Sequence, residues 1–386
     1  MLAKKAHEVA SDLLKAFDNN VFPYPYINFH TGVASAGWMK QCVSLSEVGT
    51  FDLEWRYLSD ITGDTRFKDK VDAIQQTLLK GSGGGMAGTF FSRSGSPGCR
   101  SGQKTLGAQG DSGHEYFLKA WLMSDKTNVA AKQLYDGTVR DSLADMHIPA
   151  QEQDGQFAER GHTGRHGSGG MEHLACFAGG MFALGSAEDP HNVGDITPER
   201  VLQAGETLTR TCKEAYLQSP SKLAPDMIQF SNHVLTWNQN GEGAKFLLRP
   251  ETVESVSHAP CRCSFTPLLS MHCLHPLQLF VLWRVTHKQQ YRDWGWEIAQ
   301  AIENQCRRDG GYSGLHNAAR KDGQRMLTQH SWFLAETLKY LFLLFSDDSV
   351  VPLSDFVFNT EAHPLPKVHA RQTSGAWSKA PPSTPH

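Results

Sequence analysis

The stretch LEWRYLSDITGDTRFKDKVDAIQQTLL (53–79) decides the fold, because it contains two amphipathic helices joined by a short polar turn. The same layout returns in EYFLKAWLMSDKTNVAAKQLYDGTVRDSL (115–143) and in LFVLWRVTHKQQYRDWGWEIAQAI (279–302). Four residues of the first stretch match the third at a constant offset: Thr62, Phe67, Asp69 and Ile74 correspond to Thr286, Tyr291, Asp293 and Ile298. Recurring helix pairs of this kind indicate an array of αα-hairpins.

A closed array of such hairpins forms a toroid, and its inner helices are apolar nearly all round. The segment WFLAETLKYLFLLF (332–345) fits an inner position. The sequence therefore predicts an all-α fold of the α/α-barrel type over residues 1–366, with small β-hairpins and loops at one end. The Pro- and Ser-rich stretch 367–386 is predicted to be a disordered tail.

The composition excludes several classes of partner. The chain has 386 residues, with 37 Lys+Arg against 40 Asp+Glu and a net charge of -3. Nucleic-acid binding through phosphates needs a basic excess, which is missing. No stretch reaches the roughly 18 uncharged apolar residues that can span a bilayer. The N-terminal segment carries charges where a signal peptide needs an apolar centre, so we expect neither an export signal nor a membrane anchor in this sequence.

Carboxylates at four junctions between a loop and a helix are the candidate catalytic groups. They lie in LGAQGDSGHEYFLK (Glu115), GGMEHLACFAGGMFALG (Glu172), FLLRPETVES (Glu251) and FVFNTEAHPLP (Thr360 and Glu361). Each also has a purely structural explanation that stays open. Glu115 fits the third position of a capping box that begins at Ser112. Glu172 and Glu251 suit a helix start, where the helix dipole favours negative charge, and Thr360 with Glu361 fits a polar turn.

Carboxylates at the same end of successive helices in a toroid would form an acidic cup. Glycoside hydrolysis needs two carboxyl groups, one protonated to assist the leaving oxygen and one ionised to draw a proton from water. A crowded acidic site separates their pKa values and allows both roles at one pH. Inversion requires the two groups to lie about 6.5–9.5 Å apart, which leaves room for the attacking water.

At these junctions the sequence resembles the class I α-1,2-mannosidases, glycoside hydrolase family 47. The resemblance covers nearly all of residues 1–366, and its most specific motifs are YRDWGWEIAQAI, FLAETLKYLFLLFSDD and VFNTEAHPLP. It implies an (αα)7 barrel that removes terminal α-1,2-linked mannose from high-mannose N-glycans of glycoproteins, with inversion and with bound calcium (Ca²⁺). It also implies residence in the secretory pathway, either in the endoplasmic reticulum or in the Golgi, and a disulfide in the region of Cys212.

The resemblance assigns roles residue by residue. Glu115 stands at the general-acid position, Glu251 at the base position, and Glu172 where most members have Asp as a third carboxylate. Thr360 matches the residue that binds calcium directly through its carbonyl and hydroxyl oxygens. The remaining matches contact the sugar or the calcium-bound waters, and they are Arg249, Glu254, Trp332 (an aromatic ring for stacking on mannose), Glu336 and Glu361.

Several positions depart from the family pattern. Gly113 and His114 replace two aromatic residues before Glu115, and Glu172 adds one methylene to the usual Asp. A misplacement of about 1 Å at a catalytic oxygen can cost about 100-fold in rate. For Cys212 we find no partner before Cys261, so the sequence leaves this disulfide unassigned.

Two departures are architectural. The segment VSHAPCRCSFTPLLSMHCLHPLQ (256–278) interrupts a junction that the family crosses as one helix, and we interpret it as a retained intron or a gene-model error. Residues 1–32 match a family segment that lies one to two hairpins into the barrel. We therefore expect the barrel to be incomplete at its N-terminus.

Three functions remain open from the sequence. The first is a calcium-dependent, inverting α-1,2-mannosidase of N-glycan processing. The second is a glycan-binding relative, like the mannosidase-like proteins of endoplasmic-reticulum-associated degradation, with little turnover. The third is a nonfunctional fragment of an enzyme gene.

Overall fold

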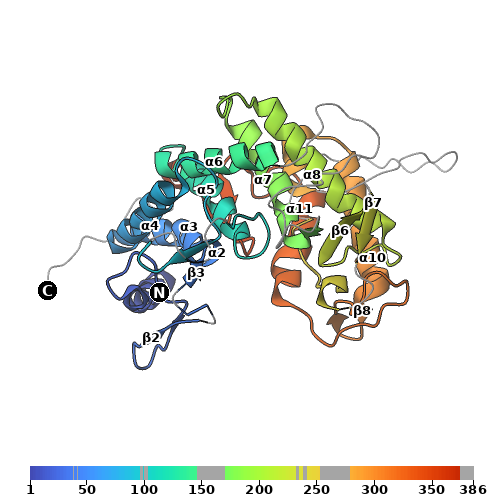
Figure 1. Cartoon of the computed structure of the whole chain (residues 1–386), viewed down its shortest axis with the longest axis horizontal. Helices are drawn as coiled ribbons and strands as arrows, with labels where there is room; N and C mark the ends of the chain where they lie inside the picture. The colour runs from blue at the N-terminus through green and yellow to red at the C-terminus, as the bar shows by residue number, and fades with distance from the viewer. Residues whose placement is uncertain are drawn as a thin grey trace. The chain divides into compact units, whose positions relative to one another are not determined.

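The computed structural model describes residues 1–37, 39–40, 42–95, 99, 103–145, 170–231, 234–237, 241–252 and 279–373 (Figure 1). Contacts within the chain divide it into two compact units. Unit 1 comprises Met1–Thr105, Gln109–Asp141 and Leu353–His386, and unit 2 comprises Leu106–Ala108 and Ser142–Pro352. Each unit is described by itself below.

Unit 1 is mainly helical, with short antiparallel strand pairs. Its helices are α1 (Leu2–Leu13), the 3₁₀ turn η1 (Leu14–Phe17), α2 (Leu45–Gly49), α3 (Asp52–Thr62), α4 (Arg66–Ser82), α5 (Asp111–Met123), most of α6 (Val129–Asp145) and α12 (Val368–Thr373). Its strand pairs are β1 (Tyr26–Ile27) with β2 (Ala34–Ser35), β3 (Cys42–Ser44) with β4 (Phe90–Ser92), and β10 (Phe356–Phe358) with β11 (Pro364–Pro366).

Unit 2 has the same mixture of helices and short strands. Its helical elements are η2 (His173–Cys176), α7 (Phe177–Glu188), α8 (Pro198–Gln218), η3 (Glu242–Ala244), α9 (Phe280–Thr286), α10 (Gln290–Cys306), the π-helical turn η4 (Phe333–Thr337) and α11 (Leu338–Phe345). Its strands form a three-stranded antiparallel sheet of β5 (Gly170–Glu172), β6 (Met227–Ser231) and β7 (Val234–Trp237), and a pair of β8 (Arg307–Arg308) with β9 (Gly311–Tyr312). The predicted small β-hairpins are thus present.

The helix pairs predicted from the repeat are confirmed as α3/α4, α5/α6 and α9/α10. In two of them the turn is built in the same way. The hydroxyl of Thr62 donates to Leu58 O (2.7 Å), and that of Thr286 donates to Leu282 O (2.6 Å). The next residue, Gly63 in one pair and His287 in the other, has a left-handed backbone (φ 76° and 52°). The matching residues therefore end the first helix by the same mechanism, which explains the constant offset.

Helix α7 is the clearest inner helix, because every residue from Phe177 to Gly185 is buried. It packs against α8 and α9 within unit 2. The contact with α8 is a close backbone approach, because a Cβ added at Gly205 would lie 2.6 Å from the carbonyl oxygen of Gly179. Only glycine allows this spacing between the two helices.

The predicted inner helix at 332–345 is only partly buried. Its core face carries Tyr340, Leu343 and Leu344, whereas Phe342 and Leu334 remain 63% and 58% exposed. Its first turn is also π-helical rather than α-helical. The apolar composition therefore predicted the helix correctly, but it overstated how much of the helix surface is buried.

Two disulfides join four of the five cysteines in the described ranges. Cys42 pairs with Cys99, and Cys176 pairs with Cys212. The partner of Cys212 is therefore Cys176, which lies upstream at the end of η2. The statement that Cys212 has no partner before Cys261 was wrong. Cys306 is buried and forms no disulfide.

The C-terminal tail is not wholly irregular, because Val368–Thr373 forms the short helix α12. His369 contacts Asp125 through its backbone N–H (2.7 Å) and its ring (2.5 Å), and Arg371 forms an ion pair with Asp60 (2.5 Å). These polar contacts order a segment whose composition predicted a coil. None of the helices in the described ranges is long and apolar enough to cross a membrane.

Candidate active site

The nine residues proposed from the sequence are divided between the two units. Unit 1 holds Glu115, Thr360 and Glu361, and unit 2 holds Glu172, Arg249, Glu251, Trp332 and Glu336. Glu254 lies outside the described residues, as does the proposed insertion at 256–278. The candidate site is therefore built up separately within each unit.

Glu115 lies in the second turn of α5 and is 5% exposed. Its carboxylate forms an ion pair with Lys119, one turn further along the same helix. This pair, formed between two buried side chains, fixes the position of the Glu115 carboxylate. The predicted capping box is absent: no side chain caps the N-terminus of α5, whose N-cap residue is Gly110. Asp111, at the first position of α5, is the other carboxylate of the motif, and we did not single it out from the sequence.

The departure at Gly113 and His114 has a packing explanation. A Cβ at Gly113 would lie 2.5 Å from Leu45 Cγ and 2.9 Å from Leu45 O, so α2 and α5 touch through their backbones here. The ring of His114 is fully buried and Nδ1 donates to the hydroxyl of Thr138 (2.9 Å). Burial, together with the charge of Lys104, lowers the pKa of His114 to about 3, so this imidazole is neutral.

The backbone N–H of Thr360 contacts a buried polar group that was not predicted from the sequence. The hydroxyl of Tyr116 accepts from Thr360 N (3.3 Å) and donates to Glu54 Oε1 (2.9 Å). The side-chain amide of Asn359 donates to the same Glu54 oxygen (2.7 Å). Glu54 Oε2 is buried and has no hydrogen-bond partner among the described residues. The helix that carries Glu54 was predicted from its repeat, but no role was predicted for its carboxylate.

A buried carboxylate oxygen without a donor is costly unless a cation or water satisfies it. The oxygen-rich group of Glu54, Thr360 and Glu361 fits a hard cation such as Ca²⁺, which prefers oxygen ligands. Thr360 and Glu361 are exposed, so their oxygens are accessible from solvent. No cluster of three or more His, Cys, Asp or Glu side chains in the described ranges could hold a metal. Protein ligands to such an ion would therefore be few.

Glu251 is held by a buried hydrogen-bond network in unit 2. His173 Nδ1 donates to Glu251 Oε2 (3.2 Å), while Nε2, which has one lone pair, accepts from the nearer hydroxyl, that of Tyr216 (2.8 Å), and the Thr252 hydroxyl lies 3.2 Å away. Because an ionised carboxylate only accepts hydrogen bonds, the contact with Glu251 places the imidazole proton on Nδ1. His173 and Tyr216 were missed in the sequence, although His173 directly follows Glu172 in the quoted motif.

The surroundings of Glu251 determine its charge. Burial alone would raise the pKa of Glu251, but the hydrogen bond from His173 and the positive charge of Arg249 outweigh burial, and the pKa is lowered. The side chain is nevertheless 12% exposed, so it is not sealed from solvent. Glu251 is therefore an ionised carboxylate near the surface, the state that a general base requires.

Arg249 contacts two of the predicted residues, Glu251 and Trp332, and also Asp226. Its guanidinium lies 2.5 Å from Asp226, 3.8 Å from Glu251 and 5.7 Å from the ring centre of Trp332. Leu248 before it has a left-handed backbone (φ 59°), and its carbonyl accepts from the hydroxyl of Thr337 (2.7 Å). Strain at a non-glycine residue beside these side chains is a common feature of functional sites.

Trp332 is positioned by its indole N–H, which donates to Leu247 O (3.0 Å). The ring of His330 stacks on one face of the indole at 4.2 Å and 6°. The Arg249 guanidinium also lies over the indole ring, 5.7 Å from its centre, so both neighbours restrict the surface left for a sugar ring. Glu336 lies one turn further along, in η4, and is 8% exposed.

Glu172 has a local role. Its Oε2 accepts from the backbone N–H of Ala108 (2.5 Å), and the residue is the N-cap of η2. The structural explanation given for Glu172 from the sequence, a carboxylate at a helix start, agrees with this position.

The cluster in unit 2 contains an ionised carboxylate, an arginine and an aromatic ring. Glycosidases are common among mainly helical proteins with such a cluster. The family model for glycosyl hydrolase family 47 matches residues 1–259 and 278–367, and the chain belongs to this family. The match is interrupted at 260–277, within the segment that we interpret as an insertion. Its interpretation as a retained intron remains a prediction.

Known relatives agree with this assignment. The chain is 40% identical over 373 residues to mannosyl-oligosaccharide alpha-1,2-mannosidase IA of Drosophila melanogaster, covering 94% of this chain and 50% of that protein. It is 37% identical over 377 residues to mannosyl-oligosaccharide 1,2-alpha-mannosidase IB of Homo sapiens, covering 96% of this chain and 54% of that protein. The chain thus spans about half the length of the curated relatives it matches.

The fold is also that of a solved structure. The α-1,2-mannosidase of Trichoderma reesei superposes with a TM-score of 0.74 at 24% identity, covering 95% of this chain and 74% of that chain. The predicted fold class, an all-α protein of the α/α-barrel type, is confirmed by this likeness.

Proposed function

We propose that this protein is a mannosyl-oligosaccharide 1,2-α-mannosidase that hydrolyses terminal α-1,2-linked mannose of high-mannose N-glycans on glycoproteins. The single observation that carries the proposal is Glu251, an ionised carboxylate held by His173 and Arg249. The names of the relatives support the substrate class. We also propose that the protein acts in the secretory pathway, in the endoplasmic reticulum or the Golgi, as the family resemblance implies.

In the proposed reaction Glu251 draws a proton from the attacking water. His173 keeps Glu251 ionised and oriented, because its Nδ1–H points to Oε2. Trp332 contributes an aromatic surface for the sugar ring, and Arg249 contacts both Trp332 and Glu251. Attack from the face opposite the leaving oxygen inverts the anomeric carbon. Glu254, Glu336 and Glu361 remain proposed contacts to the sugar or to ordered water.

The identity of the general acid stays a prediction. Glu115 matches the family position, but its carboxylate is held in an ion pair with Lys119, which also gives it a structural role. Glu172 stays a proposed third carboxylate. If Glu115 is the acid, Glu115→Gln should abolish hydrolysis as fully as loss of the base; if Glu115 and Lys119 form a structural pair, Glu115→Gln should mainly lower stability.

Calcium is proposed to bind at Thr360, with Glu54 and Glu361 holding its water ligands. When bound, such an ion supplies positive charge and fixed coordination for sugar hydroxyls. Tyr116 and Asn359 position this group by fixing Thr360 N and Glu54 Oε1. Chelation should lower thermal stability in the wild type, and Thr360→Ala should remove that effect of chelator.

The test of the proposed function is release of mannose from a high-mannose N-glycan, measured with the wild type and with Glu251→Gln. Glu242→Gln is a matched control, because Glu242 is a glutamate of the same unit with a side chain that is 90% exposed. General-base catalysis contributes about 10²–10⁴-fold, so Glu251→Gln should lose at least about 100-fold while the control retains full rate. Unchanged mannose release by Glu251→Gln would refute the role of Glu251.

The second candidate is a glycan-binding protein with little turnover. The contact that favours it is the Glu115–Lys119 ion pair, because that carboxylate already has a structural partner. Binding of an intact high-mannose glycan without release of mannose, in the presence of calcium, would select this alternative.

A further inference from the structure

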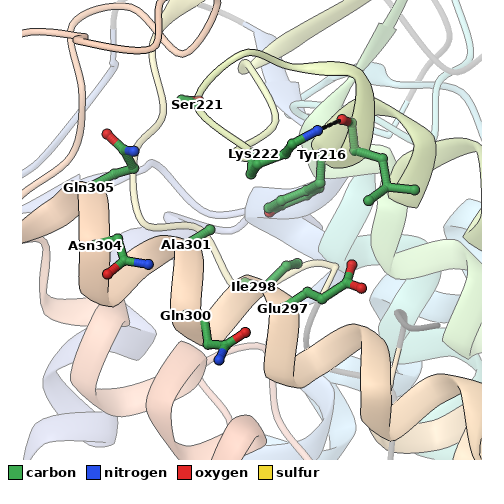
Figure 2. Close-up of a pocket in the computed structure, with 10 residues that line it drawn as sticks. Tyr216, Ser221, Lys222, Glu297, Ile298, Gln300, Ala301, Asn304 and Gln305 are labelled. Atoms are coloured by element: carbon green, nitrogen blue, oxygen red, sulfur yellow. Dashed lines mark hydrogen bonds between the residues drawn. The ribbon is translucent and has the colours of Figure 1, made fainter. Parts of the chain in front are cut away.

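A pocket in unit 2 lies apart from the proposed catalytic residues, between the C-terminal end of α8 and one face of α10. Its volume is about 360 Å³, at the small end of the range of about 300–1,000 Å³ for ligand pockets. Figure 2 shows Tyr216 and Lys222 on one side and Ala301 and Asn304 on the other. A cavity of this size suits a ligand of one or two sugar rings rather than a large cofactor.

The lining of the pocket indicates the chemistry of its ligand. Ile298 and Ala301 are buried and give an apolar floor. The rim is polar, and consists of Ser221, Lys222, Glu297, Gln300, Asn304 and Gln305. Lys222 and Glu297 carry opposite charges, so the rim as a whole favours a neutral ligand.

Carboxamides and a carboxylate can hydrogen-bond vicinal hydroxyls, which both donate and accept. The Lys222 ammonium is already fixed, because it donates to Leu217 O at the end of α8 (Figure 2). It therefore shapes the rim without needing an anionic partner. An apolar floor with a neutral polar rim matches a saccharide, whose ring has apolar C–H faces and a belt of hydroxyls.

The pocket is connected to Glu251 through one side chain. Tyr216 lines the pocket, and its hydroxyl donates to His173 Nε2 (2.8 Å), whose Nδ1 donates to Glu251 Oε2 (3.2 Å). The ring of Tyr216 is fixed further by an edge contact with Phe246 (6.2 Å between ring centres). Tyr216 is 1% exposed and forms part of the pocket wall, so a shift of this wall on ligand binding would be passed to His173 through the hydroxyl.

We propose that this pocket is a second saccharide site, and that its occupation is transmitted to Glu251 through Tyr216 and His173. The site itself stands on the pocket alone, whereas the consequence for catalysis rests on the proposed role of Glu251. A saccharide in the pocket holds the Tyr216 hydroxyl on His173 and so keeps Glu251 in one orientation.

Binding is tested by calorimetric titration of the full chain with N-acetylglucosamine and, separately, with methyl α-mannoside. Asn304→Ala removes one rim amide and Ala301→Leu fills the floor; each should weaken binding by about tenfold or more, the effect of one lost hydrogen bond or of a blocked cavity. Asn192→Ala, an exposed amide of the same unit outside the pocket, is the control and should bind normally. The sugar that binds in this series identifies the preferred ring.

Transmission is tested without any activity assay, by NMR of histidine labelled at Cε1. Saccharide should shift the His173 signal in the wild type, and should leave it unmoved in Tyr216→Phe although that variant still binds the sugar. If neither sugar binds, or if Ala301→Leu binds the sugar as tightly as the wild type does, the proposed site is wrong. Binding that leaves His173 unmoved in the wild type would overturn the connection to Glu251. Neither result depends on whether the chain hydrolyses mannosides.

Discussion

Replacement of Gly113 by alanine tests the close approach of α2 and α5. The added Cβ would lie 2.5 Å from Leu45 Cγ and 2.9 Å from the Leu45 carbonyl oxygen, and the latter is backbone that cannot rotate away. Overpacking of this kind costs about 1–3 kcal/mol. The helix propensity of alanine over glycine returns about 1 kcal/mol. We therefore expect Gly113→Ala to lower the free energy of unfolding by about 0–2 kcal/mol.

The matched control is Gly81→Ala, at an exposed position near the end of α4. Its added Cβ would meet only Phe91, at 3.9 Å, so the same substitution fits without strain. There the change should raise the free energy of unfolding by about 0.5–1 kcal/mol. Urea unfolding followed by circular dichroism measures both variants, and the expected effects have opposite sign. If Gly113→Ala stabilises the protein as much as Gly81→Ala does, the packing argument is wrong.

Three further expectations follow from residues with defined surroundings. The disulfide Cys176–Cys212 closes a loop with a sequence separation of 36, so Cys176→Ala with Cys212→Ala should cost about 4 kcal/mol, and reducing agent should shift the variant's urea midpoint less than that of the wild type, because Cys42–Cys99 is the disulfide that the variant keeps. The pKa of His114 is about 3 when folded against about 6.5 when unfolded, so the unfolded state binds the extra proton. The stability from the neutral imidazole is therefore complete above pH 6.5 and is lost as pH falls towards 3; His114→Phe should flatten the stability–pH curve over that interval, and an unchanged curve would contradict a buried neutral histidine. His287 adopts a left-handed backbone, so His287→Gly should raise the melting temperature slightly, in contrast to a Gly substitution at Gln300 within α10, which should lower it.

The helix pairs were predictable because their pattern is local. The matched residues Thr62 and Thr286 form the same hydrogen bond, so the repeated spacing in the sequence corresponds to the same turn in the structure. The tail was misread for the opposite reason. Val368–Thr373 is ordered by an ion pair between Arg371 and Asp60 and by hydrogen bonds between His369 and Asp125. These partners lie far away in the sequence and leave no trace in local composition.

The candidate site shows the same limit. Arg249 and Glu251 were found by their motif, and the structure gives them direct contact with Trp332 and His173. Glu54 and Tyr216 were missed, because each lies on a helix where a polar residue has an ordinary explanation. Their importance arises from partners that are distant in sequence, such as Asn359 for Glu54 and His173 for Tyr216.

Cys306 has a consequence for oxidative folding. Burial raises the pKa of its thiol to about 12, so at pH 7 only about one molecule in 10⁵ carries the thiolate that attacks disulfides. Once α10 has packed, this sulfur is chemically silent towards the bridges at Cys42–Cys99 and Cys176–Cys212. Disulfide exchange that begins at Cys306 is then confined to the interval before α10 packs. The order of helix packing and cysteine oxidation therefore protects the two disulfides from exchange with Cys306.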